Sequence, residues 1–164
     1  MEEANELIKI LENQLKLYEK LCELCKQEKE VIVEGDLKEL EEIVQKEEEV
    51  FTQMRIWEKL RLKVLTSLKE KFSLPEKTTF SEVIEKLRDF PSFPKLNSLR
   101  EKIISKIKEI SQINRENISL LEYSVRLIDE CFSKLTKIRN NSIYTPSGKT
   151  QIREQTQKLL NETG

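Results

Sequence analysis

One apolar track in the second half of the chain keeps an alternating spacing of four and three residues over eleven positions. A track of this kind is typical of a helix that packs along a seam against other helices. It predicts one long helix over about residues 95–139, with a polar interruption at Asn114 and Asn117. The track comprises Ile103, Ile107, Ile110, Asn114, Asn117, Leu121, Ser124, Ile128, Cys131, Leu135 and Ile138.

The first half of the chain has the pattern of two further long helices. Residues 3–33 carry two adjacent apolar tracks, which predict a helix that packs against two partners. Gly35 can end that helix, and Asp36 with Glu39 can form a capping box that begins another over residues 37–72. A turn this short between two long helices predicts an antiparallel hairpin.

The middle and the end of the chain are less regular. Thr79 and Glu82 predict a second capping box before a short helix over residues 80–89, and Pro91 and Pro94 follow it. With 36% charged residues, three glycines and four prolines, the composition is that of long helices or coiled coils. We expect an all-α fold: a long antiparallel helical hairpin plus a third long helix, as a three-helix bundle or coiled coil, with a short helical insert.

Two parts are expected along the chain. Residues 1–140 form the helical bundle, and residues 141–164 form a turn and a short C-terminal segment with weak helical periodicity at residues 150–161. The sequence leaves open whether this segment is ordered in isolation.

Composition excludes several classes of function. With 29 basic and 30 acidic residues there is no basic excess to bind nucleic acid. No apolar run approaches the ~20 residues that span a membrane, and the acidic start of the chain is unlike a signal peptide, so we expect a cytoplasmic protein. The chain has no histidine, and no catalytic array can be assembled, so we expect neither an enzyme nor a cofactor.

Two motifs have simple explanations. Cys22 and Cys25 lie on an apolar track inside a helix, where core packing explains them better than redox chemistry or zinc binding. The stretch Ser147-Gly148-Lys149-Thr150 resembles the end of a phosphate-binding loop. Ile143 stands where that loop needs its first glycine, so the resemblance is a coincidence.

Two features allow alternative interpretations. Asn114 and Asn117 either hydrogen bond to facing helices or mark a polar break where a partner helix docks. Tyr144, in the turn that follows the long helix, either packs back onto the end of the bundle or is an exposed aromatic anchor for a partner.

Several features together resemble the FlgN family of flagellar export chaperones. They are the two long helices joined by a Gly-Asp turn, "WEKLR" at residues 57–61, the insert after residue 72, "NRENISLL" with Asn114 and Asn117, and "YTPSG" with Tyr144 and Gly148. The resemblance spans almost the whole chain.

The resemblance implies a function that periodicity does not. It implies a cytosolic chaperone that binds the terminal helices of the hook-associated proteins FlgK and FlgL, prevents their premature assembly and delivers them to the type III export apparatus. The family's C-terminal region implies partner binding through Tyr144, Gly148, Ile152, Leu159 and Leu160. The alternative is a structural coiled-coil or adaptor component of the export system.

Overall fold

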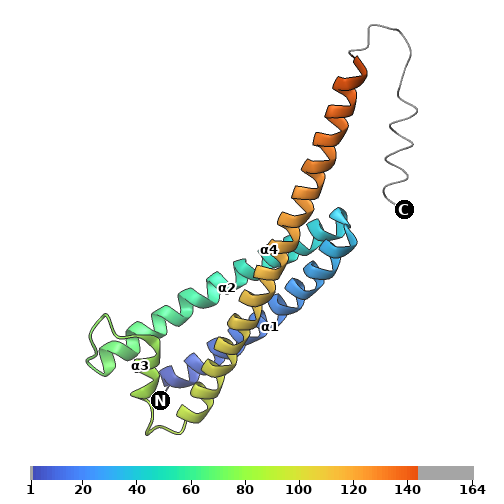
Figure 1. Cartoon of the computed structure of the whole chain (residues 1–164). Helices are drawn as coiled ribbons and strands as arrows, with labels where there is room; N and C mark the ends of the chain where they lie inside the picture. The colour runs from blue at the N-terminus through green and yellow to red at the C-terminus, as the bar shows by residue number, and fades with distance from the viewer. Residues whose placement is uncertain (1, 144–164) are drawn as a thin grey trace. The chain divides into compact units, whose positions relative to one another are not determined.

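The computed structural model describes the backbone of residues 2–143 and the side chains of residues 2–137, and all regular structure in that range is helical. The helices are α1 (Glu2–Glu34), α2 (Leu37–Lys71), α3 (Phe80–Glu85) and α4 (Phe93–Ile143) (Figure 1). The chain divides into two compact units, which we call unit 1 (Met1–Leu120) and unit 2 (Leu121–Gly164), and α4 contributes to both. The expected all-α architecture is confirmed.

The turn between α1 and α2 forms where its local sequence predicts, but only the Asp36 half of the predicted capping box is present. The Asp36 amide donates to the Val31 carbonyl at 3.3 Å instead of to the Glu39 side chain. Gly35 has a positive φ of 75°, which a side chain would strain, and its amide donates to the Val31 carbonyl at 2.9 Å. Asp36 caps α2, because its carboxylate accepts a hydrogen bond from the Glu39 amide at 3.0 Å. The two helices therefore lie side by side as an antiparallel hairpin (Figure 1).

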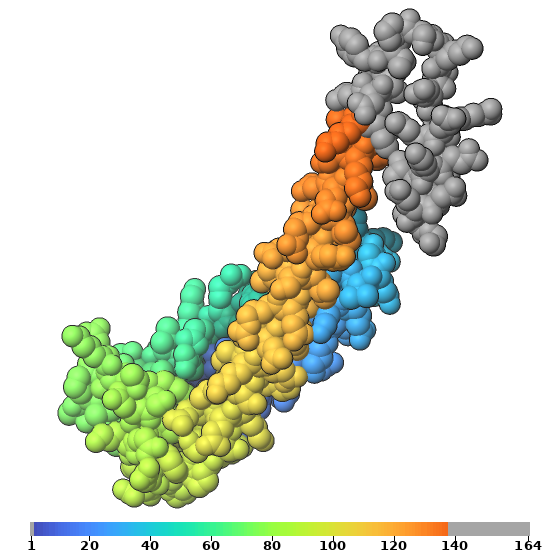
Figure 2. Space-filling model, in the orientation of Figure 1, coloured from blue at the N-terminus to red at the C-terminus, as the bar shows by residue number. Residues whose placement is uncertain are grey.

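Within unit 1, α4 runs alongside α1 in the same direction. Three ion pairs join the two helices, and their residue numbers rise together along both: Glu12–Lys95, Lys26–Glu109 and Lys29–Glu116. The part of α4 that belongs to unit 1 therefore follows α1 along its length. In Figure 2 it covers one face of the hairpin.

The insert between α2 and α4 closes one end of unit 1 (Figures 1 and 2). The Thr79 amide donates to a Glu82 carboxylate oxygen at 2.6 Å, which completes the predicted capping box. The helix that it begins is shorter than the predicted 80–89, because after Glu85 the chain tightens into turns with hydrogen bonds to the third residue back. Ile84 in α3 and Leu87 in the turns that follow are both completely buried.

Two clusters of buried apolar side chains form the core of unit 1. One joins the start of α1, the end of α2, the insert and the start of α4, and includes Leu7, Leu68, Ile84 and Leu96. The other joins the second half of α1 to the first half of α2 and to α4, and includes Leu21, Cys22, Cys25, Val50 and Ile110. Burial of each such side chain contributes about 1.5–3 kcal/mol, so the core fixes the first part of α4 on the hairpin.

The last helix continues further than predicted. The expected end at residue 139 is wrong, since α4 extends to Ile143. Neither glycine nor proline occurs between Pro94 and Pro146, so no residue in this stretch breaks a helix. None of the helices in the described part of the chain is both long enough and apolar enough to cross a membrane.

Candidate functional site

The partner-binding residues predicted from the sequence lie outside the described residues. They are Tyr144, Gly148, Ile152, Leu159 and Leu160. The two asparagines of the α4 seam are described: Asn114 is partly buried and Asn117 is buried. The description of possible sites therefore begins at Asn117.

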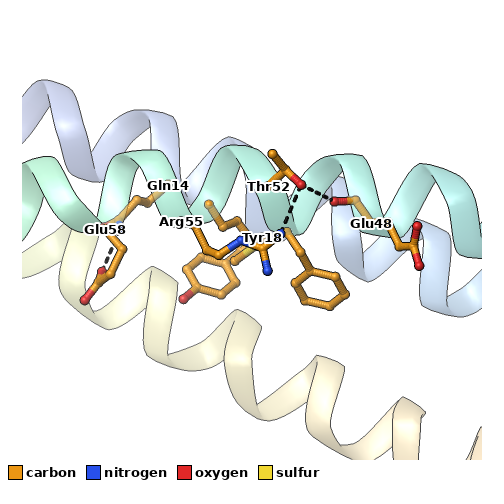
Figure 3. Close-up of a pocket in the computed structure, with 8 residues that line it drawn as sticks. Gln14, Tyr18, Glu48, Thr52, Arg55 and Glu58 are labelled. Atoms are coloured by element: carbon orange, nitrogen blue, oxygen red, sulfur yellow. Dashed lines mark hydrogen bonds between the residues drawn. The ribbon is translucent and has the colours of Figure 1, made fainter.

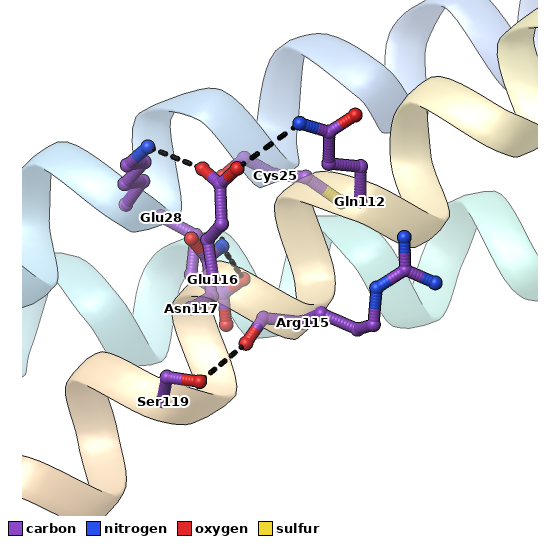
Figure 4. A network of polar contacts seen from close by, with 8 residues as sticks. Cys25, Glu28, Gln112, Arg115, Glu116, Asn117 and Ser119 are labelled. Atoms are coloured by element: carbon purple, nitrogen blue, oxygen red, sulfur yellow. Dashed lines mark hydrogen bonds and ion pairs between the residues drawn. The ribbon is translucent and has the colours of Figure 1, made fainter.

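Asn117 forms a polar contact between α4 and α1 (Figure 4). Its side-chain nitrogen donates to the Cys25 carbonyl at 2.9 Å and to a Glu28 carboxylate oxygen at 2.7 Å. Its side-chain oxygen is buried and has no hydrogen-bond partner among the described residues. Asn117 thus hydrogen bonds to a facing helix, which is the first of the two roles considered for it.

Ion pairs surround this contact. Lys29 donates to Glu116 at 2.6 Å, and Lys26 lies 3.0 Å from Glu109. Hydrogen bonds from Lys106 and Lys26 lower the pKa of Glu109 to about 2. We call the set of Asn117, Lys26–Glu109 and Lys29–Glu116 the polar belt, and it holds α4 in one register on α1.

Cys22 and Cys25 belong to the core, as expected. Both are buried free thiols, and Cys25 lies 3.4 Å from a Glu47 carboxylate oxygen. Burial, together with the charge of Glu47, raises the pKa of Cys25 to about 12. A thiol with so high a pKa is a poor nucleophile at neutral pH, so the pair has a packing role.

Side chains of α1 and α2 line an open groove of about 550 Å³ in unit 1. Figure 3 shows the α2 side chains that line it together with Gln14 and Tyr18 from α1. Arg61 makes two hydrogen bonds to Glu58, at 2.8 and 2.6 Å, and so lowers the pKa of that carboxyl group. The full lining is Gln14, Tyr18, Glu48, Phe51, Thr52, Met54, Arg55 and Glu58.

The groove has no features that indicate chemistry. Gln14 donates to Glu58 at 3.1 Å, so the carboxylate is bonded on both sides and serves the packing of α1 on α2. No cluster of Cys, Asp and Glu that could hold a metal ion occurs among the described residues. The groove is therefore a surface feature of the hairpin.

Unit 2 presents a different kind of surface. Five large apolar side chains lie along its helix at spacings of four, three, four and three residues, which places them on one face. Their exposed fractions range from 37% to 65%. We call this set the α4 stripe: Leu121, Val125, Ile128, Phe132 and Leu135.

The α4 stripe is the strongest candidate for a functional site. A continuous exposed apolar strip is uncommon on a monomeric protein and marks a surface that another molecule covers. Its heptad spacing suits an amphipathic helix, whose side chains would insert between those of the stripe. The stripe offers binding energy and no reactive group.

Sequence reasoning found the residues of this site in part. Leu121, Ile128 and Leu135 are on the predicted apolar track, but they were expected to pack in the bundle seam. Val125 and Phe132 lie beside that track and were not singled out. The signal that could have found the stripe is the length of the third helix, which exceeds that of its predicted partners.

Comparison with known proteins gives one match. The model of a family described as FlgN protein matches residues 1–152. That range includes unit 1, the α4 stripe, Tyr144 and Gly148. No curated protein and no solved structure matches the chain.

Proposed function

Since this chain belongs to the FlgN family of flagellar export chaperones, we propose that it binds the terminal helices of the hook-associated proteins FlgK and FlgL. It holds these helices in the cytoplasm, keeps them from assembling too early and delivers them to the type III export apparatus. The action is one of binding alone, without a covalent step.

The α4 stripe is the observation that supports this proposal. A client helix with an apolar face of its own would otherwise associate with other copies, because exposed apolar strips attract one another in water. Docking on the stripe covers both apolar faces at once. Each large apolar side chain that becomes fully buried contributes about 1.5–3 kcal/mol before the cost of association is subtracted.

The residues beyond the described helix belong to the same proposal. We propose that Tyr144, Gly148, Ile152, Leu159 and Leu160 add to the binding surface for the client or for the export apparatus. This part of the proposal rests on family resemblance, whereas the stripe rests on exposed side chains.

The stripe can be tested by adding charge to it. Ile128→Asp combined with Phe132→Asp should abolish co-purification with hook-associated proteins, because two carboxylates would have to be desolvated on docking. Leu127→Asp is the control: Leu127 is also exposed, at 44%, but lies outside the stripe, so this variant should still capture clients. Circular dichroism should show unchanged helicity in all variants.

A deletion variant, compared with the stripe variant, separates the two parts of the binding surface. Deletion of residues 141–164 should leave the melting temperature nearly unchanged and weaken client capture. If the stripe variant captures clients as well as the wild type does, the proposal that the stripe holds the client is wrong. If neither the stripe variant nor the deletion affects capture, the binding site lies on unit 1. If the wild type captures no client and instead self-associates through the stripe, the alternative of a structural coiled-coil component is correct.

A further inference from the structure

Charged residues are distributed unevenly around the α4 stripe. Glu122 and Asp129 each follow a stripe residue by one position, so they lie about 80–100° around the helix from its centre, at one edge. The opposite edge carries Ser124 and Cys131, which are small and uncharged. The stripe therefore has one acidic edge and one neutral edge.

The basic residues of this stretch lie outside both edges of the stripe. Lys134 and Lys137 lie about 140–160° from the centre of the stripe, on the far side of the helix. Arg126 lies about 140° from the centre, next to the acidic edge, four residues after Glu122 and three before Asp129. None of the ion pairs between described side chains involves Glu122 or Asp129. The two carboxylates at the acidic edge are thus available to a docked molecule.

The edges of an apolar seam select the partner helix. In paired helices, the residues that flank the seam meet those of the partner, and opposite charges there favour one partner over another. We infer that the α4 stripe selects a client helix whose own apolar face is bordered by Lys or Arg on one edge. Glu122 and Asp129 are then the residues that determine this specificity.

A second copy of this chain suits the stripe less well. In an antiparallel pair of copies, each acidic edge faces the other acidic edge, and the like charges repel. In a parallel pair, each acidic edge faces Ser124 and Cys131, which offer no cation. A client helix with a basic edge satisfies both carboxylates and so is the better occupant.

This inference rests on the proposed function and specifies the client. An exposed ion pair changes an equilibrium constant only about twofold. Reversal of both charges replaces two attractions by two repulsions, so the expected effect on the dissociation constant is about tenfold. Salt screens the attractions as well as the repulsions, so the change in the dissociation constant should be smaller at 1 M ionic strength.

The test uses the full chain and three synthetic amphipathic helices as probes. All three share one leucine stripe and the same lysine and glutamate content. The first carries lysines along one edge, the second carries glutamates there, and the third has its lysines on the far face. Binding is measured by fluorescence anisotropy against wild type, the charge reversal Glu122→Lys with Asp129→Lys, and the control Glu130→Lys. Glu130 lies on the far side of the same helix.

The expected result is a reversal of preference. Wild type and the Glu130→Lys control should bind the lysine-edged helix about tenfold more tightly than the glutamate-edged one, and the double reversal should prefer the glutamate-edged helix. Equal binding of all three helices would overturn the acidic-edge inference and leave the proposed function intact. If none of the helices binds, both the inference and the role of the stripe are wrong.

Discussion

The buried nitrogen of Asn117 gives the sharpest test of how α4 is held on α1. Asn117→Asp changes this nitrogen to an oxygen with almost no change in shape. It removes hydrogen bonds to the Cys25 carbonyl at 2.9 Å and to the Glu28 carboxylate at 2.7 Å, and it leaves oxygen atoms facing each other. Loss of one neutral and one charged hydrogen bond costs about 2–4 kcal/mol at pH 7.

The cost should depend on pH in a definite direction. The pKa of the introduced carboxyl group is raised in the folded state, because the group is buried and faces Glu28. Its protonated form can donate a hydrogen bond, so the penalty is smallest below the unfolded value of about 3.9. The penalty grows as the pH rises toward the folded pKa and is largest at neutral pH.

Urea unfolding followed by circular dichroism measures the difference between wild type and variant at each pH. The control is Asn97→Asp: Asn97 donates to Glu101 at 2.9 Å on the exposed surface of the same helix, so this variant should lose less than about 0.5 kcal/mol. Glu28→Gln should restore part of the stability lost in Asn117→Asp, since an amide can donate to the new carboxylate. A cost at position 117 that matches the control, or that does not vary with pH, would refute the reasoning.

Two further predictions concern the insert and the ion pairs of unit 1. Ile84→Ala should lower the free energy of unfolding by about 2–5 kcal/mol, because Ile84 is fully buried in the core of the insert; a smaller loss in urea unfolding would show that the insert is dispensable. The lowered pKa of Glu109 means that its ion pairs stabilise the fold above about pH 4.5 and are lost as the pH falls toward 2. Glu109→Gln should therefore weaken the dependence of the urea midpoint on pH in that window, and an unchanged dependence would contradict the assignment.

The parts of the fold that sequence predicts well are those fixed by local chemistry. Gly35 and Asp36 specify the turn of the hairpin by backbone conformation and side-chain capping, and both act within four residues. The Thr79–Glu82 box begins α3 for the same reason. These features do not depend on which residues pack nearby, so they can be predicted from the local sequence alone.

Features that depend on distant residues were harder to predict. The predicted helix at 80–89 ends at Glu85, because the turns that follow serve to bury Leu87 in the core of unit 1. Asn117 looked equivalent to Asn114 in the sequence, but only Asn117 is buried against α1. Periodicity places a residue on a helix face without showing what covers that face.

Because periodicity does not show what covers a helix face, it could not tell the buried part of the apolar track from its exposed part. Its earlier members, such as Ile110, are buried in unit 1, and its later members, such as Ile128, are exposed in unit 2, although both obey the same spacing. The difference follows from length: α1 has 33 residues and α4 has 51, so α1 is too short to cover all of α4. Ion pairs and hydrogen bonds from α1 reach α4 up to Asn117, and the exposed stripe begins four residues later at Leu121. A chain that needed only a stable bundle would have polar residues beyond that point. The heptad continues there with acidic residues along one edge, and the client helix that we propose would cover it.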